Sequence, residues 1–171
     1  LKSRHETFSI TGGVSFYDFP ETKKETGTTY SGPYSSIPTG IEGYQLLNAF
    51  IDFTLGEEQH PLTLFADYVN NGKTSKKNNG YTVGVKYNKA KEPGTWDAEL
   101  FYRLLEPNAV IANLADGDID YGDVTAVRAS FSYALAKNSI GRLSYLNTQR
   151  NASTNTKTQY DVGQLDFVFS F

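Results

Sequence analysis

The sequence predicts an all-β fold, namely a transmembrane antiparallel up-and-down β-barrel with about eight strands. Three observations predict it: segments in which apolar and polar residues alternate, connections that are alternately short and long, and one nearly uncharged apolar face. The composition agrees, because 12 Tyr, 11 Phe and 15 Gly without Met or Cys favour strands and turns over helices. A length of 171 residues fits one domain, so we expect residues 1–171 to form a single barrel domain.

Eight segments alternate with the two-residue period of a strand. Turn-forming residues such as Gly, Pro, Asn and Asp lie between them. In chain order the segments are Phe8–Phe19, Tyr44–Leu55, Pro61–Asn70, Tyr81–Asn88, Trp96–Leu104, Val124–Leu135, Ile140–Thr148 and Tyr160–Phe171. Because their number is even, the last segment ends on the side of the sheet where the first one begins.

The connections between these segments fall into two alternating classes. GEEQH, AKEPGT and AKNS are short, whereas the intervening connections, such as NGKTSKKNNG and QRNASTNTKTQ, are mostly longer and polar. Short periplasmic turns and long extracellular loops are typical of outer-membrane barrels. The pattern therefore predicts a meander with turns at one end and loops at the other.

The alternation also sorts the strand residues onto two faces. One face carries aliphatic and aromatic side chains, for example Leu47, Leu100 and Phe131, and almost no charge. The opposite face carries charged residues among Ser, Thr, Gly and Asn, namely Asp52, Asp67, Lys86, Asp97, Glu99, Arg103, Arg128, Arg142 and Asp166. A barrel that is polar inside and apolar outside needs lipid around it, which predicts the outer membrane of a Gram-negative bacterium.

A soluble lipocalin-like barrel that binds a small ligand is an alternative with the same number of strands. It would bury nine ionisable side chains in its core, at several kcal/mol each unless they were paired. Its outer face would also be an apolar patch larger than soluble proteins tolerate. The polarity of the two faces therefore disfavours the soluble barrel.

Aromatic residues gather near both rims of the apolar face. Trp96, Tyr87 and Tyr133 are expected near the turns, and Tyr68, Tyr81 and Tyr102 near the loops. Aromatic side chains with one polar edge prefer the headgroup level, so two such girdles match a bilayer about 25 Å thick.

No catalytic constellation emerges from the sequence. His5 and His60 lie far apart and lack the spacing of metal ligands, and no nucleophile elbow or phosphate-binding Gly-rich loop is present. We therefore expect no enzyme activity and no cofactor. The acidic stretch with Asp116, Asp118 and Asp120 is a weak calcium candidate, for which a solvated loop is the favoured interpretation. The net charge of −3, with both signs interspersed, argues against nucleic acid as a partner.

The last third of the chain resembles the carboxy-terminal barrel region of a porin family of Gram-negative outer membranes. The resemblance lies in YRLLEPNAV, in the acidic loop LADGDID, in the pattern N-x-x-G-x-L-x-Y, and in a final strand that ends in Phe. It implies a passive-diffusion barrel, which is either a complete small barrel or the last eight strands of a larger porin. It also implies that Phe167, Phe169 and Phe171 form a signal for the barrel-assembly machinery.

The charges of the polar face set the expected function. Lys86 is expected beside Asp97 and Glu99 on the neighbouring strand. Arg103 and Arg128 are expected on adjacent strands, at about the same distance from the turns as each other. Arg142, on the next strand, completes a basic run. An arginine ladder facing carboxylates creates a field that selects solutes by charge; a salt-bridge network filling a closed barrel is the alternative.

We therefore expect a porin-type channel for passive diffusion of small hydrophilic solutes or ions. The alternative is a closed eight-stranded barrel with a structural or surface-interaction role, and the soluble barrel comes third. Expected partners are outer-membrane lipid, lipopolysaccharide, the barrel-assembly machinery and small solutes, and an oligomer is compatible with the sequence.

Overall fold

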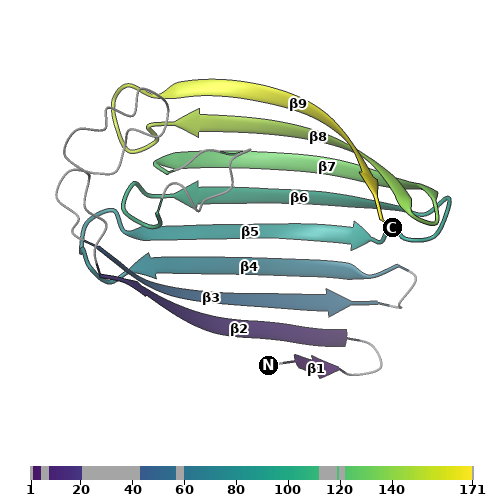
Figure 1. Cartoon of the computed structure of the whole chain (residues 1–171), viewed down its shortest axis with the longest axis horizontal. Coiled ribbons are helices and arrows are strands. Elements are labelled where there is room, and N and C mark those ends of the chain that lie inside the picture. The colour runs from purple at the N-terminus through teal and green to yellow at the C-terminus, as the bar shows by residue number, and fades with distance from the viewer. Residues whose placement is uncertain are drawn as a thin grey trace.

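The computed structural model describes residues 2–4, 8–20, 43–56, 60–111, 119 and 122–170. Every regular element within them is a β-strand, and all the strands form one antiparallel sheet in chain order, from β1 at one edge to β9 at the other (Figure 1). None of these residues forms a helix long and apolar enough to cross a membrane. The strands are β1 (Lys2–Arg4), β2 (Phe8–Phe19), β3 (Tyr44–Leu55), β4 (Leu62–Asn71), β5 (Asn79–Asn88), β6 (Trp96–Leu105), β7 (Val124–Ala136), β8 (Ser139–Arg150) and β9 (Thr158–Phe169).

The eight predicted segments correspond to β2–β9, so the all-β class and the up-and-down meander are confirmed. The short strand β1 was not predicted; it pairs antiparallel with residues 9–11 of β2. The described residues form an open sheet and not a closed barrel, because β9 pairs with β8 alone and makes no contact with β1 or β2. Period and turn length specify which strands are neighbours, but they do not specify whether the first and last strands meet.

The two ends of the sheet differ as predicted. Connections β3–β4, β5–β6 and β7–β8 lie where the strands end on one side of the sheet, which we call the turn end, and β9 also ends there (Figure 1). Residues 137–138 alone join β7 to β8, and Gly94 in the β5–β6 turn has a φ of +86°, which a glycine adopts without steric cost. Connections β4–β5, β6–β7 and β8–β9 lie at the opposite ends of the strands, which we call the loop end.

An apolar cluster lies on the charged face of the sheet near the loop end. Ala109 and Ile119, from the β6–β7 connection, are fully buried in it against strand side chains. The strand members are Tyr44, Leu46, Val69, Phe101, Leu105, Val124, Ala126 and Leu146. The sequence analysis described this face by its charged and small polar residues, whereas its loop end also carries apolar residues. These are buried because residues of a long connection fold back over them.

Candidate functional site

The face opposite this cluster exposes large hydrophobic side chains. Leu143 and Leu165, for example, keep 60% and 64% of their surface exposed. The other exposed members include Val14, Phe16, Leu47, Ile51, Leu64, Val83, Leu100, Val127, Phe131 and Phe167. These are residues that the sequence assigned to the outward side, and we call this surface the apolar face. Soluble monomers rarely expose a continuous apolar patch that crosses a whole sheet.

The apolar face has a well-defined border toward the loop end. Toward the loop end of each strand, the outward positions beyond one point carry only polar residues or glycine. The last large apolar residues before this point, from β2 to β9, are Phe16, Leu47, Tyr68, Tyr81, Leu104, Val127, Tyr145 and Leu165.

This border crosses the sheet diagonally. When the cross-strand pairs are followed from strand to strand, Leu165 on β9 falls on the row of Phe8 on β2, which is eight residues below Phe16 (16 − 8 = 8). Eight residues span about 26 Å along a strand, and the seven gaps between β2 and β9 span about 34 Å. The border is therefore inclined by about 38° to the hydrogen-bonding direction, close to the tilt of roughly 35–45° in transmembrane barrel strands.

The border at the turn end slopes the same way but less steeply. Leu55 on β3 shares the row of Leu165, and Phe169 lies four residues further toward the turn end (169 − 165 = 4). Over the six gaps between β3 and β9, this drop corresponds to about 25° by the same conversion. The strip of apolar residues between these two borders, which we call the apolar band, therefore narrows toward β9 in the described part of the chain.

The predicted aromatic residues lie near these two borders. Near the turn end, the Trp96 ring lies 5.7 Å from that of Tyr87 and 5.8 Å from that of Phe131, between centroids, and Tyr133 is the cross-strand partner of Trp96. Near the loop end, Tyr81 is the cross-strand partner of Tyr68. The ring centroid of Tyr81 also lies 6.0 Å from that of Tyr102.

Two of the predicted charge groups lie near the turn end of the charged face. Lys86 Nζ lies 3.7 Å from Asp97 Oδ2, and Glu99 is the cross-strand partner of Lys86. Further along the sheet, Arg142 on β8 pairs in register with Asp166 on β9 and donates from Nε to the Ser132 hydroxyl at 3.1 Å; Ser132 is fully buried. The predicted acidic and basic residues are thus brought together at these two places.

Arg103 and Arg128 are diagonal neighbours. Arg128 is opposite Phe101, so it lies two residues nearer the turn end than Arg103. Its Nη2 donates to the Ser144 hydroxyl at 3.3 Å, while Arg103 Nε donates to the Thr82 hydroxyl at 3.0 Å. Arg103 and Arg128 were expected at about the same height on adjacent strands, and the structure places them on adjacent strands with an offset of two residues. Asp52 lies on the same face, opposite Phe65 on β4.

Several predicted site residues fall outside the described part of the chain. These are the acidic-loop residues Asp116, Asp118 and Asp120 and the terminal Phe171; His5, which was assigned no site, also lies outside it. Phe167 and Phe169 are described and lie exposed on the apolar face, and His60 is exposed at the turn end. Among the described residues, no group of three or more His, Cys, Asp or Glu side chains is placed to hold a metal ion.

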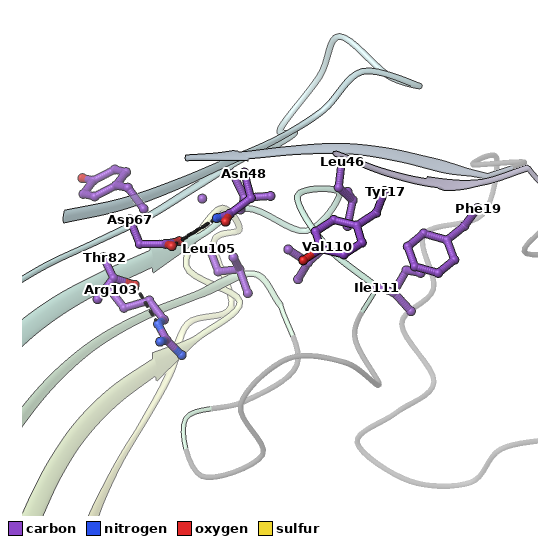
Figure 2. Close-up of a pocket in the computed structure, with 13 residues that line it drawn as sticks. Tyr17, Phe19, Leu46, Asn48, Asp67, Thr82, Arg103, Leu105, Val110 and Ile111 are labelled. Atoms are coloured by element: carbon purple, nitrogen blue, oxygen red, sulfur yellow. Dashed lines mark hydrogen bonds between the residues drawn. The ribbon is translucent and has the colours of Figure 1, made fainter. Parts of the chain in front are cut away.

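The structure adds a cavity that the sequence analysis missed. It has a volume of about 480 Å³ and lies on the charged face near the loop end, between strands β2–β6 and the start of the β6–β7 connection (Figure 2). Its lining includes Asp67 and Arg103 from the predicted charge set, together with Tyr17, Phe19, Leu46, Asn48, Val69, Thr82, Leu105, Val110 and Ile111. No sequence signal predicts it, since its apolar wall comes partly from a folded-back connection.

Comparison with known proteins adds no assignment. No protein-family model matches the chain, and no curated protein or solved structure matches it. The function is therefore argued from the two faces of the sheet.

Proposed function

We propose that this chain forms the wall of an outer-membrane β-barrel channel, through which small hydrophilic solutes or ions diffuse passively. The observation that carries the proposal is the diagonal apolar band on the exposed face. A bilayer is a flat slab, so its apolar zone must cross tilted strands at an angle to their hydrogen-bonded rows. The loop-end border of the band has the inclination that such tilted strands require.

The position of the buried core supports the same orientation. The residues that bury apolar surface against a connection lie on the charged face, and the large exposed hydrophobic residues of the band lie on the other. A ligand-binding soluble barrel would need its continuous apolar face on the inside. Lipid is therefore the cover that the apolar face fits best, and the charged face then borders the lumen.

A membrane location also has a consequence for the edges of the sheet. Backbone N–H and C=O groups without partners cost several kcal/mol each in hydrocarbon, so open sheet edges do not persist in a bilayer. In the membrane, the two edges of the sheet, at β1–β2 and at β9, must therefore pair along their length, either with each other in a small barrel or with further strands in a larger one. Only the larger barrel leaves a wide aqueous channel.

The lumen charges would give such a channel its selectivity. Arg103, Arg128 and Arg142 form a basic run across β6–β8, while Asp52 and Asp67 lie on β3 and β4. Opposed charges across an aqueous lumen create a field that partitions ions by sign.

A closed barrel with a structural or surface role remains the second candidate, and one observation favours it. Phe101, Leu105 and Leu146 are buried on the charged face, and an eight-stranded barrel has an interior that side chains fill. A filled barrel would conduct no ions, so conductance separates the two candidates.

Planar-bilayer recording of the full protein tests the proposal. The triple variant Arg103→Gln, Arg128→Gln and Arg142→Gln should conduct but shift its selectivity toward cations in a salt gradient. The matched control neutralises three exposed loop lysines instead, through Lys73→Gln, Lys76→Gln and Lys157→Gln, and should change the reversal potential much less. Absence of channels from the wild-type protein would refute the channel; equal shifts in both triple variants would refute the proposed selectivity.

A further inference from the structure

The cavity on the charged face has a polar end and an apolar end. Asp67 and Thr82 lie at the polar end together with Arg103, whereas Leu46 and Ile111 lie toward the other end (Figure 2). Its volume of about 480 Å³ lies within the range of roughly 300–1,000 Å³ that small-molecule sites occupy. The cavity therefore fits a small molecule with one charged end and one apolar end.

Asp67 provides a negative group at the polar end. Both of its carboxylate oxygens accept hydrogen bonds from Asn48 Nδ2, at 3.1 Å each, which hold the carboxylate in place. Among the described residues it has no ion-pair partner. An oriented carboxylate beside apolar walls is a strong acceptor for an ammonium group.

Arg103 provides a positive group on the same row of the sheet. Asp67 is opposite Thr82, and Thr82 is opposite Arg103, so one strand separates the two charges. Arg103 leans toward that strand, because its Nε donates to the Thr82 hydroxyl at 3.0 Å. A guanidinium carries five N–H donors, which suits simultaneous contacts to a hydroxyl and to a carboxylate.

We propose that this cavity binds a free α-amino acid with an apolar or aromatic side chain. The ligand's ammonium group binds Asp67, its carboxylate binds Arg103, and its side chain packs against Leu46, Val69 and Ile111. An amine without a carboxylate leaves Arg103 without a ligand contact, and an acid without an amine places like charges together at Asp67. Glycine has no side chain to fill the apolar end. The assignment of this cavity to the solute path rests on the function proposed above, whereas the binding itself does not.

Calorimetric titration of the folded wild-type protein with L-phenylalanine, in detergent micelles, tests the inference. L-phenylalanine should bind at least about 10-fold more tightly than glycine, 2-phenylethylamine or 3-phenylpropionate, since losing one charged contact or the apolar contact costs about a factor of 10 or more. Asp67→Asn keeps the shape of the side chain and should weaken L-phenylalanine binding by a similar factor. Asp52→Asn removes a carboxylate that lies on the same face but outside the cavity lining, and should bind as the wild type does.

The outcomes separate this inference from the proposed channel. No measurable binding at about 10 mM L-phenylalanine, a concentration about ten-thousandfold above a micromolar dissociation constant, would overturn it. The inference would also be overturned if glycine, 2-phenylethylamine and 3-phenylpropionate bound as tightly as L-phenylalanine, or if the Asp67 and Asp52 variants bound L-phenylalanine equally well. Planar-bilayer recording is the independent readout: channels without amino-acid binding refute the inference alone, and binding without channels refutes the channel alone.

Discussion

Two aliphatic residues on one hydrogen-bonded row test whether the apolar band follows a bilayer. Ile51 on β3 and Val127 on β7 share a row through Ala66, Val83 and Tyr102, and their side chains are 50% and 40% exposed. Leu47 marks the loop-end border on β3, whereas Val127 is itself the border residue on β7. In the proposed membrane orientation, Ile51 therefore lies well inside the hydrocarbon and Val127 at its surface.

The expected energies follow from this difference in depth. Ile51 lies four residues below the border (51 − 47 = 4), which at about 3.3 Å per residue and a tilt of about 38° is about 10 Å. The midplane of an apolar zone about 25 Å tall lies about 12 Å below its border. Ile51→Arg should therefore lower the free energy of unfolding by about 2–4 kcal/mol, and Val127→Arg by about 0–1 kcal/mol.

Equilibrium unfolding in lipid vesicles measures both values. Trp96 is the single tryptophan and is partly exposed on the apolar face, so its fluorescence reports whether that face is in contact with lipid. Equal costs for the two arginine variants would show that the band does not follow a membrane plane. A greater cost for Val127→Arg would refute the direction of the tilt.

Two further pairs of variants test the faces and their packing. Leu100→Arg on the apolar face should cost about 2–4 kcal/mol in lipid, whereas Ser130→Arg, opposite Glu99 on the charged face, should cost less than about 1 kcal/mol; equal losses would show that the faces are assigned wrongly. Gly84→Ala should cost roughly 1–3 kcal/mol, because its Cβ would lie 2.7 Å from a phenylalanine Cβ and 2.8 Å from a backbone oxygen. Gly163→Ala meets no atom within 4 Å and should change stability by less than about 0.5 kcal/mol. Chemical denaturation checks both pairs, and a tolerated Gly84→Ala would contradict the described packing.

The strands could be predicted from the sequence because their signal is local. Period-two alternation depends on neighbouring residues, and the eight predicted segments correspond to β2–β9. The three residues of β1, KSR, carry no alternation that would distinguish them from a loop, so that strand was missed.

Register across a long connection could not be predicted. Arg103 and Arg128 were expected at about the same height, and Arg128 is opposite Phe101, which leaves an offset of two residues. The chain between β6 and β7 is too long to fix the pairing of the two strands, unlike the two-residue turn between β7 and β8. When a long connection joins two strands, positions along them that are counted in residues from the turns therefore give only an approximate alignment.

The cavity and the apolar cluster could not be predicted for a related reason. Both depend on residues of the β6–β7 connection, such as Ala109, Val110 and Ile111, packing over strand residues far away in sequence. Strand periodicity indicates which side chains share a face but not which loop folds onto that face. Asp67 and Arg103 were found from charge alone, while their apolar surroundings required the tertiary structure.

Site-directed spin labelling along β6 tests the central claim most directly. The chain has no native cysteine, so Leu100→Cys and Glu99→Cys each give one labelling site, on the apolar and the charged face. In lipid vesicles, the label at 100 should collide mainly with oxygen, which concentrates in hydrocarbon, and the label at 99 mainly with a water-soluble nickel chelate. A label at 100 that is more accessible to the chelate than to oxygen would contradict the membrane orientation and the channel that depends on it.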